Sequence, residues 1–186
     1  GGYKIDRLVD CSYPLIDWHP TKPLLSIIAE DKEEIHLNYY FLETKAKERR
    51  TIHHFQKILD FSYSDDGKQF VMSAIQNGQT DIFVYHLSKN TAVNVTNDIY
   101  DDLTPRFINN SEDIVFTSNR INDTLNISKK SGRPASLSMA KNKDVFLYNY
   151  SHKSKVLKRI TNTPSDNESF PVEFDQKVIS YLSDQN

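Results

Sequence analysis

The feature that most constrains this chain is a repeat of about 44 residues. An aromatic residue closes one predicted strand in each repeat, at Trp18, Tyr63, Phe107 and Phe174, and these residues lie 45, 44 and 67 positions apart. The last interval is long because a polar segment at 122–142 lies inside it. A period near 44 with four strands per unit is the sequence signature of a β-propeller blade.

Apolar and polar residues alternate with a period of two along the whole chain, which is typical of half-buried β-strands. The runs at 24–29, 70–75 and 114–118 are examples, and turn signals such as Asp65-Asp66-Gly67 and Asn77-Gly78 separate the runs. No helical periodicity persists over three turns. The sequence therefore predicts an all-β chain.

The repeat predicts one partial propeller over residues 1–186, with about three and a half four-stranded antiparallel blades. We expect residues 3–11 to form the outer strand of a preceding blade. Three blades at 12–55, 56–99 and 100–164 would follow, with the insertion at 122–142 and half a blade at 165–186. Closed propellers have about 4–8 blades, so we expect a piece of a longer protein, and open blade faces that favour self-association of the isolated chain.

Four short motifs stand at offsets that match one blade of such a repeat. They are FSYSDDGK at 61–68, DIFVY at 81–85, VTN at 95–97 and FTSNR at 116–120. The motifs resemble the FSPDGK turn, the SDIYV third strand, the LTN fourth strand and the FTSDR second strand of TolB-like β-propeller repeats. The resemblance covers nearly the whole chain. It implies a propeller in a bacterial setting, periplasmic or otherwise extracytoplasmic.

Composition narrows the classes of partner. The net charge is −2 and the isoelectric point is near 6.3, which disfavours nucleic acid because phosphate binding needs a basic face. The single cysteine, Cys11, excludes a disulfide within the chain and a cysteine metal site. No apolar run approaches the ~20 residues of a membrane helix. We expect no cofactor, no metal and no insertion into a membrane.

A group of polar residues is predicted to surround one mouth of the central channel. In a propeller, the loop that enters the inner strand and the loop between the second and third strands open on the same face. Carboxylates, amides and a guanidinium on that face could contact a partner. The residues are Asp101, Asp102, Asn119, Arg120, Asn167 and Glu168.

The insertion at 122–142 is locally basic and rich in Ser, Asn and Lys. Loops of this length in compact domains are either functional or disordered. A partner-contact loop would use Lys129, Lys130 and Arg133, whereas the alternative is an insertion with no contact role.

No motif for nucleophilic catalysis is present, since none of the five glycines forms Gly-x-Ser-x-Gly or a phosphate loop. We therefore predict no catalytic residues and a non-catalytic binding scaffold for a protein or cell-envelope component. One alternative is the substrate-gating propeller of a prolyl-oligopeptidase-like serine peptidase, whose catalytic domain would lie outside this chain. A third is a carbohydrate-active propeller that uses mouth carboxylates.

Overall fold

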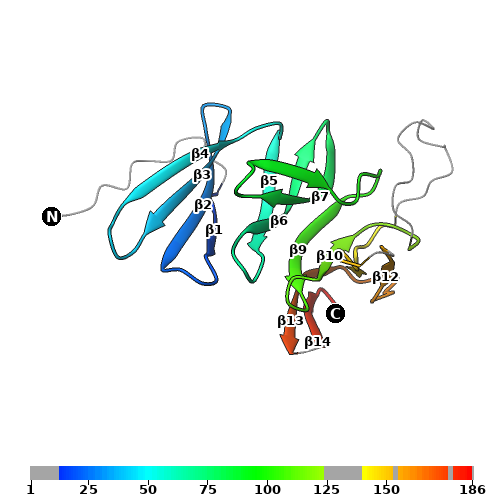
Figure 1. Ribbon diagram of the computed structural model, residues 1–186. Helices are drawn as coiled ribbons and strands as arrows, with labels where there is room; N and C mark the ends of the chain where they lie inside the picture. Colours follow the sequence, from blue (N-terminus) through cyan, green and yellow to red (C-terminus); the bar gives the residue numbers. More distant parts are fainter. Residues whose placement is uncertain (1–12, 124–139, 153–154, 176–177, 186) are drawn as a thin grey trace.

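The computed structural model describes residues 13–123, 140–152, 155–175 and 178–185. The predicted outer strand at 3–11 and residues 124–139 of the insertion lie outside the described residues. Within the described part of the chain there is no helix, and thus none that could cross a bilayer. The strands form three four-stranded antiparallel sheets and one two-stranded sheet (Figure 1). The predicted all-β propeller piece of about three and a half blades is confirmed.

Each four-stranded sheet is a meander in which consecutive strands pair with each other. Blade 1 consists of β1 (Leu15–Trp18), β2 (Leu24–Asp31), β3 (Glu34–Phe41) and β4 (Lys47–Ile52). Blade 2 consists of β5 (Lys57–Tyr63), β6 (Gln69–Gln76), β7 (Gln79–His86) and β8 (Thr91–Asn94). Blade 3 consists of β9 (Asp102–Ile108), β10 (Asp113–Ser118), β11 (Asp144–Tyr148) and β12 (Leu157–Arg159). The half-blade consists of β13 (Glu168–Asp175) and β14 (Val178–Ser183).

The blades stand side by side in chain order (Figure 1). The first strand of each blade contacts the first strand of the next, from β1 to β5, β9 and β13. These first strands are therefore the inner strands, and their free edges face the propeller axis. Two of them carry a bulge beside a proline: Thr104 precedes Pro105 and Phe170 precedes Pro171, with φ of 49° and 50°. A bulge and a proline disrupt the hydrogen-bonding edge of a strand and so discourage further strand pairing.

Apolar side chains between the blades form the core, as the period of two predicts. In β7, Phe83 and Tyr85 face blade 1 and join one buried cluster, whereas Ile82 and Val84 face blade 3 and join the next. A third, smaller cluster joins blade 3 to the half-blade. Burial on both faces explains why β6 and β7 are almost entirely apolar in their centres.

The tight turn between β5 and β6 requires a glycine. Gly67 has φ of +68°, a left-handed conformation that glycine adopts without strain. A Cβ atom there would lie 2.3 Å from Cε1 of His19, which comes from the corresponding turn of blade 1. The turn is further held by Ser64, whose hydroxyl donates to Asp66. The turn therefore fixes both a hairpin and a contact between blades 1 and 2.

Candidate functional site

Asp101 and Asn119, two of the six predicted mouth residues, bond to each other at the ends of their loops. The Asp101 amide donates to Oδ1 of Asn119 at 2.9 Å, and Nδ2 of Asn119 donates to Oδ2 of Asp101 at 3.4 Å. The half-blade repeats this arrangement. There the Asn167 amide donates to Oδ1 of Asp184 at 2.5 Å, and Nδ2 of Asn167 donates to Oδ2 at 2.9 Å. These pairs tie each entry loop to the end of the neighbouring second strand.

The other three predicted mouth residues lie in the interior. Asp102, Arg120 and Glu168 are fully buried, so their expected position on an open rim is wrong. Nη2 of Arg120 lies 2.8 and 2.7 Å from the two carboxylate oxygens of Asp102. A buried ion pair of this geometry satisfies charges that would otherwise be costly to desolvate. These charged side chains therefore stabilise the contact between neighbouring blades.

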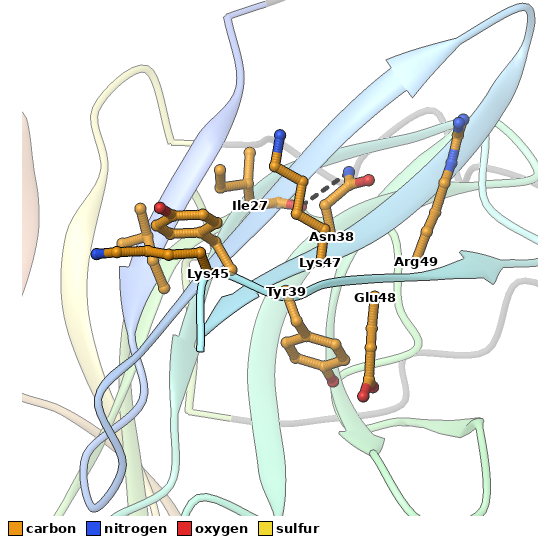
Figure 2. A pocket seen from close by; sticks show the side chains of 9 residues that line it. Ile27, Asn38, Tyr39, Lys45, Lys47, Glu48 and Arg49 are labelled. Atoms are coloured by element: carbon orange, nitrogen blue, oxygen red, sulfur yellow. Dashed lines mark hydrogen bonds between the residues drawn. The ribbon is translucent and has the colours of Figure 1, made fainter. Parts of the chain in front are cut away.

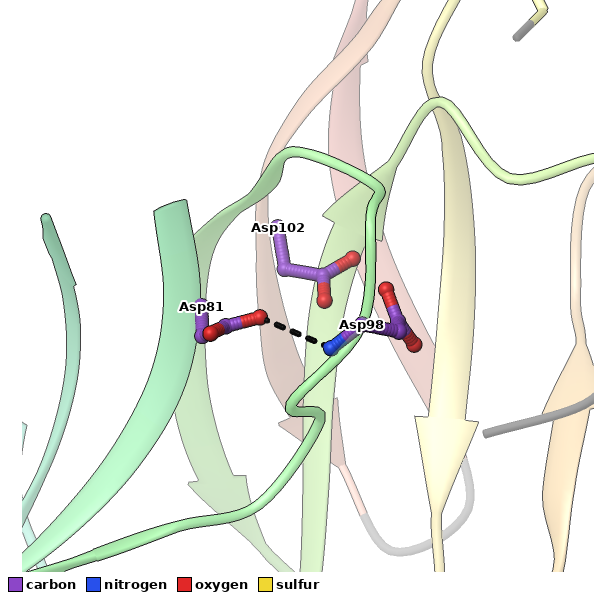
Figure 3. A group of neighbouring side chains, drawn as sticks. All are labelled: Asp81, Asp98 and Asp102. Atoms are coloured by element: carbon purple, nitrogen blue, oxygen red, sulfur yellow. Dashed lines mark hydrogen bonds between the residues drawn. The ribbon is translucent and has the colours of Figure 1, made fainter. Parts of the chain in front are cut away.

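Two aspartates of blade 2 and the following loop complete this network, called here the junction network (Asp81, Asp98, Asp102 and Arg120). Oδ2 of Asp98 accepts from Nη1 of Arg120 at 3.2 Å, and Oδ1 of Asp98 accepts from the Tyr100 amide at 3.0 Å. Asp81 accepts from the Asp98 amide at 3.2 Å (Figure 3). The third strand of one blade is thus joined to the first and second strands of the next.

The three carboxylates of the junction network lie close enough to share a cation, since one oxygen from each falls within 4.8 Å of the others. Their oxygens are already acceptors, however. Asp102 and Asp98 accept from the Arg120 guanidinium, and Asp81 accepts from Nδ2 of Asn94 at 2.9 Å. Arg120 supplies the positive charge that a cation would bring. We interpret the cluster as a structural junction.

Burial dominates the electrostatics of the junction network. It raises the pKa of Asp98 to about 7, with a further contribution from the Asp102 charge and an opposing one from Arg120. Burial also raises the pKa of Asp102, although Arg120 counteracts it. For Arg120, burial acts to lower the pKa, but the two carboxylates raise it overall. Asp98 and Asp102 therefore hold a proton up to a higher pH than exposed aspartates do.

A related network joins blade 3 to the half-blade. Asp144 occupies the place of Asp81 and accepts from Nη2 of Arg159 and from the Thr163 amide. Glu168 occupies the place of Asp102 and accepts from the Thr163 hydroxyl at 2.8 Å. By register, Gln185 stands where Arg120 stands in blade 3, because Ser183 pairs with Glu168 as Ser118 pairs with Asp102. The sequence signal for both networks is an acid three residues before the inner-strand proline.

The junction between blades 1 and 2 departs from this pattern. His36 stands at the place of Asp81, and its Nδ1 lies 3.4 Å from the Thr51 hydroxyl. Ile58 stands at the place of Asp102, by its pairing with Ala74. The first junction therefore has no carboxylate–guanidinium network at these positions and is held by the apolar cluster and by the contact of His19 with Gly67.

The basic residues expected to make a partner-contact loop, Lys129, Lys130 and Arg133, lie outside the described residues. A hollow of about 900 Å³ that sequence reasoning did not anticipate lies against blade 1. Figure 2 shows Asn38, Lys47 and Arg49 on one side of the sheet and Tyr39 and Glu48 on the other. The first side has no neighbouring blade among the described residues.

Four-stranded blades joined side by side through their inner strands define the chain as part of a β-propeller. No protein-family model matches the sequence, and no curated protein is significantly similar to it. Several solved structures share this propeller fold. TolB from Acinetobacter baumannii is similar over 87% of this chain and 34% of its own, with a TM-score of 0.59 and 19% identity. The TolB-like fold predicted from the repeat motifs is thus confirmed.

Two further structures share the fold. A protein described as a putative TolB from Agrobacterium tumefaciens is similar over 82% of this chain and 50% of its own, with a TM-score of 0.56 and 13% identity. A prolyl endopeptidase is similar over 85% of this chain and 24% of its own, with a TM-score of 0.53 and 11% identity. The chain spans between a quarter and half of these proteins. At such identities the likeness concerns the fold alone.

Proposed function

We propose that the chain is a non-catalytic binding propeller that presents its loops and blade ends to a protein or a cell-envelope component. The observation that carries the proposal is that charged side chains predicted to line the mouth instead hold two blades together. Asp98, Asp102 and Arg120 are fully buried and bonded to one another across a blade junction. Groups used in this way stabilise a rigid support and cannot reach a substrate.

The setting that we propose is the periplasm or another extracytoplasmic space, as the TolB-like resemblance implies. TolB structures among the similar folds support this setting. The alternative of a peptidase gate keeps some support, because a prolyl endopeptidase shares the fold. The two proposals differ in a testable way: only the gate requires a hydrolase domain in the same protein.

Quantitative cross-linking tests the binding proposal. The purified chain, carrying a photoreactive group, is incubated with solubilised cell-envelope proteins and, separately, with cytosolic proteins of the same cells. We expect a saturable adduct in the envelope fraction that an excess of unmodified chain abolishes. Adducts that are the same in both fractions, or that excess chain does not reduce, would contradict the proposal.

A second measurement tests the alternative. A fluorophosphonate probe that reacts with activated serines is added to the native full-length protein, and labelled peptides are identified by mass spectrometry. Labelling of a serine outside the propeller would favour the peptidase gate. The binding proposal expects no labelling above that of the heat-denatured protein.

A further inference from the structure

A pocket of about 350 Å³ lies between blades 1 and 2. It opens where the turn between the first and second strands and the turn between the third and fourth strands meet. In an antiparallel meander these turns lie at the opposite end of the blade from the predicted mouth residues. The volume falls within the range of about 300–1,000 Å³ that is typical of small-molecule sites. None of the residues that line the pocket belongs to the junction network.

The floor of the pocket is apolar and aromatic. Leu24, Tyr39 and Tyr63 are buried there, and Phe41 and Leu87 are partly buried. The Tyr63 hydroxyl bonds to Ser26 at 2.6 Å, which fixes the ring. A floor of this kind favours a ligand with a flat or apolar body.

The rim of the pocket is cationic. Lys22, Arg50 and Lys68 line it with a single acid, Glu48, so the charged lining residues sum to +2. Lys68 also bonds to Asp66 at 3.2 Å. The pKa of nearby His19 is lowered, first by burial and then by the charge of Lys22. The rim therefore favours an anionic group.

Arg50 breaks the repeat at this point. Its counterparts in the next two blades are Val95 and Ile160. Arg50 pairs with Leu37 of β3, and the amides of Val95 and Ile160 donate to the equivalent third-strand residues, Ile82 and Val145. Val95 packs against the apolar cluster between blades 2 and 3. A charged residue at a position that is apolar in the other repeats costs junction packing, and departures of this kind are expected at functional sites.

The guanidinium of Arg50 is held in place by two contacts. Its Cζ lies 5.7 Å from the centroid of the Tyr39 ring, and its Nη1 donates to the Leu87 carbonyl at 3.2 Å. Among the described residues, Nη2 and Nε of Arg50 have no hydrogen-bond partner. A fixed guanidinium with donors to spare is suited to an oxyanion, which it can bind through two parallel hydrogen bonds.

We propose that this pocket binds a small aromatic oxyanion, with the oxyanion held by Arg50 and Lys22 and the ring against Tyr39, Leu24 and Leu87. This site lies beyond the proposed partner-binding role and does not require it. Aryl phosphates and aryl carboxylates share the necessary chemistry. Phenyl phosphate serves as the probe, with inorganic phosphate and phenol testing the charged and aromatic halves separately.

The experiment is a titration of the full 186-residue chain with each probe. Binding is measured by the NMR chemical shifts of the backbone amides in the pocket turns and by calorimetry. We expect saturable binding of phenyl phosphate, with a dissociation constant about tenfold lower than that of inorganic phosphate or phenol. Binding should also raise the pKa of His19, because a bound anion favours the charged imidazolium. No saturable change up to ~10 mM phenyl phosphate would overturn the proposal.

Arg50→Val and Arg49→Val form a matched pair of variants. Valine at position 50 reproduces Val95 of blade 2, so we expect the fold to persist. Arg49 is the preceding residue of β4, faces the other side of the sheet and bonds to Asp31 at 3.1 Å. Arg50→Val should weaken phenyl phosphate binding at least about tenfold, whereas Arg49→Val should not change it. Equal effects of the two variants would mean non-specific charge attraction and would overturn the site.

The turn variant Lys22→Ala provides an independent check, because its effect does not depend on packing within the sheet. We expect it to weaken binding of phenyl phosphate and of inorganic phosphate by similar factors, and to leave phenol binding unchanged. Unchanged binding of all three probes would remove Lys22 from the site and contradict the proposed placement of the oxyanion.

Discussion

Asp98 is the residue at which the junction network is most sensitive to pH. Its side chain has no solvent exposure, accepts from Arg120 and Tyr100, and faces the carboxylates of Asp102 and Asp81. Because one guanidinium cannot neutralise three buried carboxylates, the folded protein favours a proton on this group. The cost of ionisation is therefore part of the free energy of folding.

The direction of the pH effect follows from the raised pKa. The pKa of Asp98 is about 7 in the folded chain and near its ordinary value of 3.8 in the unfolded chain. Its contribution to stability is full below about pH 4 and is lost as the pH rises through about 7. We expect the midpoint of thermal unfolding to fall by several degrees between pH 5 and pH 8, and this fall to be smaller in Asp98→Asn. Equal pH slopes for the variant and the parent chain, measured by calorimetry, would contradict this assignment.

The position of these acids also shows the limit of sequence reasoning at the residue scale. Asp102 and Glu168 precede the inner strands that the sequence pattern predicts, so sequence alone places them in an entry loop near a mouth. Their burial depends on hydrogen-bond donors elsewhere in the chain. Arg120, 18 residues later, donates to Asp102, and Thr163, 5 residues earlier, donates to Glu168. Local patterning carries no information on such a partner. Alignment of the repeats by register, which pairs Asp102 with Ser118 and Glu168 with Ser183, does contain the signal.

At the scale of elements, the strands and turns were the most predictable part of the chain. The alternation with a period of two and the Asp-Asp-Gly and Asn-Gly turns determine the hairpins locally, and β5–β7 follow them closely. The pocket between blades 1 and 2 could not be predicted in this way. It arises because Arg50 and Tyr39 stand where blade 2 has Val95 and Val84, a difference that matters only once the two blades face each other.

The turn at Gly67 gives a prediction about contacts between elements. Gly67→Ala places a Cβ atom 2.3 Å from the His19 ring in addition to straining a backbone with φ of +68°. We expect a loss of stability of about 2–3 kcal/mol, measured by urea unfolding. The clash should also loosen the contact of His19 with Tyr63, whose ring centroids lie 4.9 Å apart.

Gly78→Ala is the matched control for this prediction. Gly78 has φ of +73°, and nothing lies within 4 Å of the position that a Cβ atom would take there. This variant therefore measures backbone strain alone, which costs about 1 kcal/mol. If the two variants were equally destabilised, His19 would not restrain the turn. The contact of His19 with Gly67 would then contribute nothing to the free energy of unfolding.

At the scale of the whole molecule, the two outermost sheets present apolar side chains to solvent. Ile16 and Trp18 of blade 1 are each 57% exposed, and Leu182 and Phe174 of the half-blade are 62% and 78% exposed. Their counterparts inside the array, such as Tyr63 and Phe61, are buried against a neighbouring blade. The number of blades in the chain was predictable from the repeat, and the exposed faces follow from it.

Two hollows beside these sheets are lined by charges of opposite sign. The hollow on blade 1 is lined by Lys45, Lys47, Arg49 and one acid, Glu48. The hollow between blade 3 and the half-blade, of about 860 Å³, is lined by three acids and one cation, which are Asp113, Glu173, Asp175 and Lys158. Opposite charges steer association and discriminate against wrong pairings. A head-to-tail contact between copies is therefore favoured over contact of like faces.

We accordingly expect the isolated chain to associate as its concentration rises, and added salt to weaken the association by screening the charged rims. Sedimentation velocity over a range of concentrations measures this directly. Trp18→Lys and Leu182→Lys should each reduce association, because each places a charge in an apolar contact, but mixing the two variants should restore it. One intact blade 1 face and one intact half-blade face then remain in the mixture, on different copies. A monomer at all concentrations would contradict the expectation, and equal association of each variant alone and of the mixture would show that the contact uses other surfaces.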